Sequence, residues 1–255
     1  MDEDDLHGGE EERIGALELV VTSARILGSS FLAFALLTLL VMVPGYVATI
    51  SLREWAGGGD PNAVLWASLA TAALRTVLTL LAQAALVHGT VERLAGRPVS
   101  LSRSLAAVLG RAWPLLALAM IQSLAISLAL LACIIPGVVL ACVLFVSIPA
   151  AVVERRGPLE AMQRSADLTR GHRLTLFAVG LPLVLLAVAG HYGLSMALAP
   201  HAPHDLPLRI ADYAAQALLA ALFMMFQAVL AAVLYTRARR IHDGDDVDTI
   251  AKVFE

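Results

Sequence analysis

Charged residues are scarce in this chain of 255 residues, at 15% against 59% apolar residues. A soluble domain carries about 25% charged residues, because water must solvate most of its surface. This shortage excludes a water-soluble globule of this size and indicates that lipid is the solvent for most of the surface. Lysine is almost absent as well, since Lys252 is the only lysine among 18 basic residues.

Cysteine and an N-terminal positive charge are also lacking. The two cysteines, Cys133 and Cys142, lie in apolar stretches without metal-ligand spacing, so we interpret them as small core residues. The chain starts with the acidic stretch MDEDDLHGGEEE, whereas a signal peptide starts with positive charge. We therefore expect the first apolar run to remain in the membrane as an anchor.

Long apolar runs are abundant and predict an all-α membrane protein, because about 20 apolar residues cross a bilayer as a helix. The charge-free run 112–153 is twice that length, so Pro136-Gly137 near its middle is predicted to be a turn between two spans. The predicted membrane domain, 13–240, lies between acidic tails at 1–12, which is predicted to be disordered, and at 241–255. Its six predicted spans are 26–52, 63–88, 112–134, 137–153, 174–199 and 213–236.

Basic residues are distributed unevenly between the two sides of these spans. Six spans place both termini on one side, and that side receives fifteen basic residues, against only Arg53 and Arg209 on the other. Basic loops stay in the cytoplasm. The distribution therefore predicts cytoplasmic termini and a bacterial cytoplasmic (inner) membrane.

Short amphipathic helices are predicted before the odd-numbered spans, because Ser100 is a favourable N-cap and Pro158 suits a first helical position. Arg103-Ser104 and Arg164-Ser165, 61 residues apart, are each followed by a glycine six residues after the serine. We predict three repeats, each an interfacial helix plus two spans. The alternative is that similar constraints at each membrane boundary select similar residues. The predicted interfacial helices are 13–25, 100–110 and 158–170.

The stretch 136–171 carries an ordered set of residues: Pro136-Gly137, Pro149, Glu154, Gly157-Pro158-Leu159-Glu160-Ala161, Arg164-Ser165 and Leu168-Thr169-Arg170-Gly171. This order resembles the membrane domain attached to some bacterial glycerophosphoryl diester phosphodiesterases, and related stand-alone, uncharacterised bacterial membrane proteins. In the fused enzymes the chemistry belongs to a separate soluble barrel with a metal site. No stretch outside the predicted spans is long enough to fold that barrel. The resemblance therefore implies an accessory membrane module without phosphodiesterase activity.

Arg75 lies near the middle of the second predicted span, where an arginine costs about 2.5–3.5 kcal/mol to insert. No acidic residue lies within the six predicted spans. Thr71, Arg75, Thr79 and Gln83 recur at every fourth position and form a polar stripe on one helical face. The stripe is a candidate site for an anionic group such as a lipid phosphate, or the lining of a polar path. The alternative is a structural arginine bonded to carbonyls that a proline in a neighbouring helix leaves free.

Glu92 and Glu154 occupy corresponding positions, each just before a predicted interfacial helix. We predict that they pair with Arg103 and Arg164 to hold these helices, with Arg170 as a further member of the set. Arginines at the interface also attract anionic head groups, by about 1 kcal/mol each. The alternative is that they only set the topology and form local ion pairs.

We interpret the chain as a non-enzymatic module that engages or organises membrane lipids, including those with anionic head groups. A transporter or channel using the stripe around Arg75 is one alternative, and a scaffold for a protein partner or a homo-oligomer is another. We predict no cofactor, metal site, catalytic residue or nucleic-acid partner. His191, His201, His204 and Asp205 lack the spacing of a zinc site, and no acid–base pair lies within a span.

Overall fold

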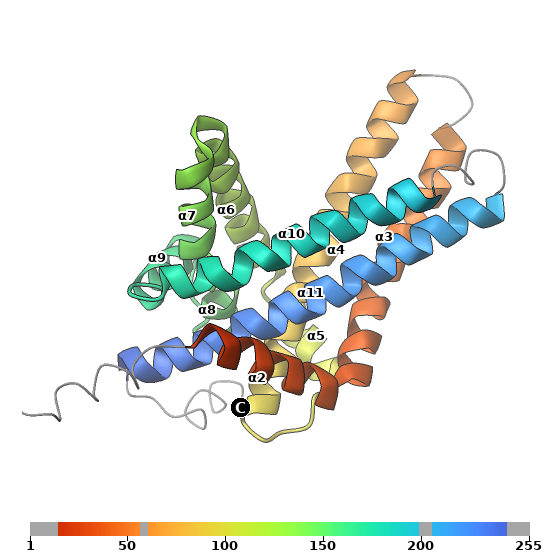
Figure 1. Cartoon of the computed structure of the whole chain (residues 1–255). Helices are drawn as coiled ribbons and strands as arrows, with labels where there is room; N and C mark the ends of the chain where they lie inside the picture. Colours follow the sequence, from red (N-terminus) through yellow and green to blue (C-terminus); the bar gives the residue numbers. More distant parts are fainter. Residues whose placement is uncertain (1–14, 57–60, 199–205, 244–255) are drawn as a thin grey trace, which may run out of the picture.

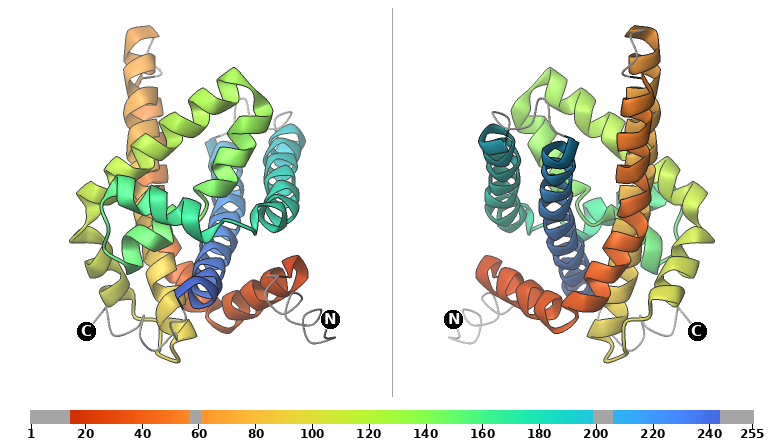
Figure 2. Two further views of the ribbon diagram at one scale, coloured as in Figure 1. Left: turned by 90° about the vertical axis from the view of Figure 1, so that its left-hand side faces the viewer. Right: turned by 90° about the vertical axis from the view of Figure 1, so that its right-hand side faces the viewer.

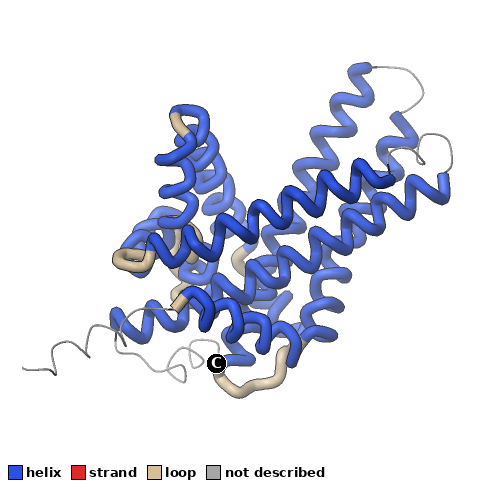
Figure 3. Tube along the Cα trace, viewed as in Figure 1, coloured by secondary structure: helices blue, strands red, loops and turns tan. Residues whose placement is uncertain are grey.

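The computed structural model describes residues 15–56, 61–198 and 206–243, and no strand occurs within these ranges (Figure 3). The all-α prediction is confirmed. The helices labelled in Figure 1 are α2 (Ala16–Ser29), α3 (Phe31–Ala56), α4 (Pro61–Leu94), α5 (Leu101–Leu109), α6 (Ala112–Ala132), α7 (Ile134–Val143), α8 (Ser147–Val153), α9 (Pro158–Leu168), α10 (Arg173–Leu198) and α11 (Leu206–Asp243).

Six helical stretches are long and apolar enough to cross a membrane, which confirms the predicted spans in number and order. The last one is longer than predicted, because α11 continues to Asp243. Arg239 pairs with Asp243 one helical turn further on, at 3.5 Å, and such pairs stabilise a helix. The first three residues of the predicted tail 241–255 therefore belong to this helix. The six stretches are Phe31–Leu52, Pro61–Leu94, Ala112–Ala132, Ile134–Val153, Arg173–Met196 and Ala214–Asp243.

The first span begins at Phe31 and not at residue 26 as predicted. Residues 26–29 extend the short helix α2, and the chain turns at Ser30. The Ser30 N–H donates to the carbonyls of Ile26 and Leu27 at 3.2 and 3.3 Å, which closes the end of α2. Gly28, Ser29 and Ser30 are weaker helix formers than the apolar residues around them, which accounts for the break.

The turn between the third and fourth spans lies at Cys133, where φ is −167°, and not at Pro136-Gly137 as predicted. Pro136 instead sits in the first turn of α7, where its missing N–H leaves no hydrogen bond unmade. Gly137 allows α7 to lie close to α6, since a Cβ there would be 2.8 Å from the Leu130 Cα. The prediction of a helical hairpin was therefore correct, but its turn lies three residues before the predicted position.

The fourth span is interrupted between α7 and α8. Pro149 has no N–H to donate to the carbonyl four residues before it, which disfavours a continuous helix there. Gln122 of α6 compensates for the interruption: its Nε2 donates to the Leu144 carbonyl at 3.4 Å. Its Oε1 accepts from the Ser147 hydroxyl at 2.5 Å. A polar side chain in one span thus adds a hydrogen bond to the interrupted backbone of the next.

The core lies where the second helices of the three hairpins meet. In α4 the residues 84–92 are all buried, in α11 residues 228–236 are, and α8 is buried throughout. These three helices contact one another pairwise. The window of the last span is 56% buried inside the protein, against 11% for the third and fifth spans, so α6 and α10 have a peripheral position. Figure 2 shows the hairpins directed upward, away from α2 and α5.

The three short helices each pack on one of these central helices: α2 on α11, α5 on α4 and α9 on α8. Polar contacts join α2 to α11, because Arg237 of α11 binds Glu18 at 2.8 Å and Thr22 at 3.1 Å. We call the end of the bundle formed by α2, α5, α9 and the last residues of α4, α8 and α11 the arginine-rich end. This arrangement is the one that three repeated units would give, and the repeat itself stays a prediction.

Candidate functional site

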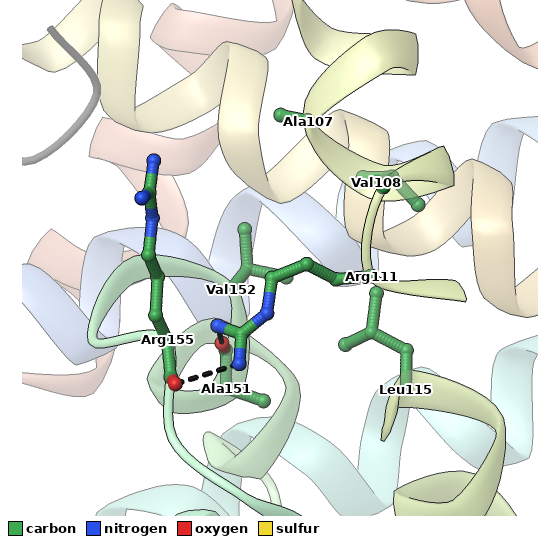
Figure 4. A pocket seen from close by; sticks show the side chains of 8 residues that line it. Ala107, Val108, Arg111, Leu115, Ala151, Val152 and Arg155 are labelled. Carbon is green, nitrogen blue, oxygen red and sulfur yellow. Dashed lines mark hydrogen bonds between the residues drawn. The ribbon is translucent and has the colours of Figure 1, made fainter. Parts of the chain in front are cut away.

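A pocket of about 470 Å³ opens at the arginine-rich end, between the corner that joins α5 to α6 and the end of α8 (Figure 4). Its polar groups are two arginines, and none of its lining side chains is acidic. Its walls are otherwise small or apolar. The lining residues are Ala107, Val108, Gly110, Arg111, Leu115, Ala151, Val152 and Arg155.

Arg111 is positioned by the end of α8. Its guanidinium donates to the Arg155 carbonyl at 2.7 Å and to the Ala151 carbonyl at 3.4 Å (Figure 4). The last carbonyls of a helix lack partners within it, and a cation near them is favoured by the helix dipole. These two bonds leave further N–H donors, since a guanidinium has five.

Arg155 has a φ of +53°, two residues beyond the last residue of α8. Glycine or asparagine usually takes this left-handed position after a helix, and another L-residue there costs about 1–2 kcal/mol. The side chain of Arg155 is exposed and extends away from the backbone bond with Arg111 (Figure 4). The pocket is thus lined by a second guanidinium, that of Arg155, which does not take part in the bonds between Arg111 and the end of α8.

Tryptophans place this pocket at the depth of a membrane interface. Trp113, two residues after Arg111, is 80% exposed, while Trp55 and Trp66 are exposed at the other ends of their spans. Exposed tryptophans at span ends gather at the level of lipid head groups. The pocket is therefore level with head groups, and its arginines carry a positive charge that no lining residue neutralises.

The predicted pair between Glu92 and Arg103 is present, with Glu92 Oε1 3.2 Å from Arg103 Nη1. The Glu92 side chain is 3% exposed and that of Arg103 is 56% exposed. Glu92 Oε2 has no hydrogen-bond partner among the described residues. Beside this pair, the Ser104 hydroxyl lies 3.2 Å from His88 Nδ1, in a buried contact. We call this contact of α4 with α5 the Glu92 junction.

The predicted pair between Glu154 and Arg164 is also present, with Arg164 Nε donating to Glu154 Oε1 at 2.9 Å. The Tyr235 hydroxyl donates to the same oxygen at 2.9 Å, and Arg156 binds the other oxygen. Arg164 further binds Asp243. Burial lowers the pKa of Arg164, but the hydrogen bonds and charges of Asp243 and Glu154 outweigh it and raise this pKa above its ordinary value. We call this contact of α8, α9 and α11 the Glu154 junction.

Arg170 forms an ion pair at the interface, as predicted, but its partner is Asp167 and it does not join the Glu154 junction. It lies just beyond α9, is 73% exposed, and pairs with Asp167 at 3.3 Å. Arg156, Tyr235 and Asp243 are the members that sequence reasoning missed. For Tyr235 and Asp243 the reason is that nothing in the local pattern links α11 to residues some 80 positions earlier. A usable signal was the tyrosine next to the basic run that ends the sixth span.

The stripe on α4 is not a continuous polar surface. The Thr71 hydroxyl donates to its own helix at Ala67, and the Thr79 hydroxyl donates to the Arg75 carbonyl. Gln83 is half-buried, several turns from Thr71 toward the arginine-rich end. The polar atoms of Thr71 and Thr79 are thus largely satisfied within α4. This leaves Arg75 as the group of the stripe to be explained.

Arg75 contacts Tyr46 of α3, which the sequence did not single out. Its guanidinium lies 4.7 Å from the centre of the Tyr46 ring, and its Nη2 is 3.3 Å from the phenol oxygen. A desolvated cation–π contact contributes about 2 kcal/mol, less than the ~2.5–3.5 kcal/mol cost of a mid-membrane arginine. Among the described residues, the partner of Arg75 is therefore an aromatic ring without negative charge, and not the carbonyls that a proline in a neighbouring helix would leave free.

Of the histidines considered for a metal site, the structure describes His191. His191 stacks edge-on against Tyr192, with ring centres 5.7 Å apart. His201, His204 and Asp205 lie outside the described residues. Within residues 15–56, 61–198 and 206–243, no group of three histidine, cysteine or acidic side chains is placed to hold a metal ion.

Comparison with known proteins identifies a family for this chain. Residues 15–238 match the model of a family described as a domain of unknown function, DUF7847. No curated protein matches the chain, and no solved structure does. The resemblance to the membrane domain of glycerophosphoryl diester phosphodiesterases therefore stays a prediction.

Proposed function

Since the chain belongs to the DUF7847 family, whose function its description leaves open, we propose a function from the site: a non-enzymatic membrane module that binds anionic lipid head groups at its arginine-rich end. Basic loops favour the cytoplasm, so the leaflet concerned is the cytoplasmic leaflet of a bacterial inner membrane, with both termini inside the cell. The module acts as an accessory protein that gathers or organises these lipids.

The observation that carries this proposal is the pocket between Arg111 and Arg155. The guanidinium is a planar fork that matches the oxygens of a phosphate, and Arg111 is already held in place by two carbonyls. The apolar walls from Val108, Leu115 and Val152 suit the glycerol and the first methylenes of a lipid. The pocket thus offers arginines to the phosphate and apolar walls to the adjoining hydrocarbon of a lipid whose head group lies at the depth of Trp113.

Lipid enrichment around the reconstituted chain tests the proposal. The full chain is placed in nanodiscs of mixed phosphatidylglycerol and phosphatidylcholine, extracted with mild detergent, and the retained lipid is quantified by mass spectrometry. We expect phosphatidylglycerol to be retained preferentially. Arg155→Gln should reduce this preference about tenfold, the value of a lost hydrogen bond to a charged group.

Arg173→Gln is the matched control, because Arg173 is an exposed arginine at the start of the fifth span that does not line the pocket. It removes the same charge, and solvent screening should limit its effect to about twofold. Equal retention of the two lipids by the unaltered chain would overturn the proposal. Equal losses in the two variants would show general attraction by charge without a pocket.

A further inference from the structure

Arg75 has no carboxylate in the segments around it. The flanking stretches 31–52 of α3 and 214–242 of α11 contain no acidic residue, and the nearest acid along α4 is Glu92, 17 residues away. Trp66, which is 68% exposed, marks one membrane interface. Arg75 lies nine residues further along α4, about 14 Å deeper, which is close to the middle of a ~30 Å hydrocarbon layer. A positive charge is therefore held at mid-membrane without a negative partner there.

A small cavity of about 90 Å³ adjoins this guanidinium. Tyr46, Arg75 and Thr79 supply its polar groups, from α3 and α4. The remaining wall is apolar, with Met42 and Leu78 on one side and alanines and a methionine of α11 on the other. The cavity is large enough for a few water molecules, and hence for a carboxylate, but too small for a whole phospholipid head group.

The cavity is open toward the surroundings of the protein. Arg75 and Thr79 are exposed, and so is Ala220 on the opposite wall. The packing of α3 on α4 is already close, because a Cβ on Gly45 would lie 2.9 Å from Leu78 Cδ1. A ligand can therefore reach the guanidinium from the lipid side, between α4 and α11, without any displacement of α3.

We propose that this cavity binds the carboxylate of a long-chain fatty acid, with the acyl chain extending from the cavity into the surrounding lipid. A carboxylate pairs with two N–H groups at the edge of a guanidinium, in the plane of the guanidinium. The Tyr46 ring packs against Arg75, with its centre 4.7 Å from the guanidinium carbon. The methionine, leucine and alanine walls favour an acyl chain over a hydrated inorganic anion. This site is separate from the pocket at the arginine-rich end and stands independently of it.

Binding of radiolabelled palmitate to the full chain in nanodiscs of neutral phosphatidylcholine tests the proposal. Hexadecanol, which has the same chain without the charge, is the matched probe, and chloride is the competitor for a simple anion site. We expect saturable binding of palmitate, at least tenfold weaker binding of hexadecanol, and no competition by chloride. Arg75→Gln should weaken palmitate binding at least tenfold, and Arg75→Lys less, since lysine keeps the charge and loses the fork.

Two further variants keep the test decisive if Arg75→Gln fails to fold. Ala220→Leu fills the cavity and leaves Arg75 in place, so it should weaken palmitate binding severalfold. Thr76→Val is the control, because Thr76 donates to its own helix at Ala72 and does not line the cavity. Unchanged binding in Ala220→Leu, equal binding of hexadecanol, or displacement by chloride would each overturn the proposal. Arg155→Gln should leave palmitate binding unchanged, so failure here is distinct from failure of the head-group pocket.

Discussion

The Glu92 junction and the Glu154 junction use the same two residue types in different surroundings. In each, a glutamate at the end of a span pairs with an arginine of the next short helix, at 3.2 and 2.9 Å. At the Glu154 junction both carboxylate oxygens have partners, and Arg164 is only 13% exposed. At the Glu92 junction one oxygen is buried without a described partner, and Arg103 is 56% exposed.

The difference comes from α11. Tyr235, which is fully buried, and Asp243 both reach the Glu154 junction, so a third helix completes the pair that α8 and α9 begin. The Glu92 junction receives no such carboxylate or hydroxyl from α11 among the described contacts. A local pair therefore becomes a network only where the last span supplies partners. This distinction predicts unequal responses to the same substitution.

Glu154→Gln should have the largest effect. It leaves Arg164 largely buried with Asp243 as its remaining carboxylate, and removal of one member of a buried ion pair costs about 3 kcal/mol. We expect a marked fall in the midpoint of thermal unfolding in detergent. The double variant Glu154→Gln with Arg164→Gln should recover part of this loss, because no unpaired charge then stays buried. An unchanged midpoint in Glu154→Gln would contradict a network role for α11.

Tyr235→Phe should have an intermediate effect, because it removes only the hydroxyl that donates to Glu154 at 2.9 Å. A hydrogen bond to a charged group contributes about 1.5–3 kcal/mol, and Arg164 and Arg156 still bind the carboxylate. We expect a loss near the lower of these values, read from the same unfolding measurement. Tyr192→Phe, at an exposed tyrosine of α10, is the control that should leave the midpoint in place.

The two junctions also show what the sequence could predict. Glu92 with Arg103 and Glu154 with Arg164 are about ten residues apart, so the position of a span end and the start of a short helix are enough to bring them together. The six spans follow from hydrophobicity in the same local way. Most features decided by the nearby chain were therefore predicted, with errors of a few residues at Ser30 and Cys133. The local pairs of Arg156 with Glu154 and of Arg170 with Asp167 were not assigned.

Partners supplied by distant helices were not predicted. Tyr235 lies 81 residues from Glu154, and Tyr46 lies 29 residues from Arg75. Which faces of the hairpins meet depends on the packing of small residues along their whole length, and helical periodicity in one span does not determine it. The same limit explains why Thr71 and Gln83 looked equivalent to Arg75 in the stripe, although neither lines the cavity beside it.

Glu92→Gln should have the smallest effect of the three, within about 1 kcal/mol and of either sign. The pair with exposed Arg103 contributes little, because solvent screens such contacts. Against this small loss, the substitution removes a buried charge whose Oε2 lacks a described partner, and that relief is favourable. The unfolding midpoint should therefore stay close to that of the unaltered chain, in contrast to Glu154→Gln. A loss as large as that of Glu154→Gln would mean that the two junctions are energetically equivalent, and that the partners from α11 add little to the pair they surround.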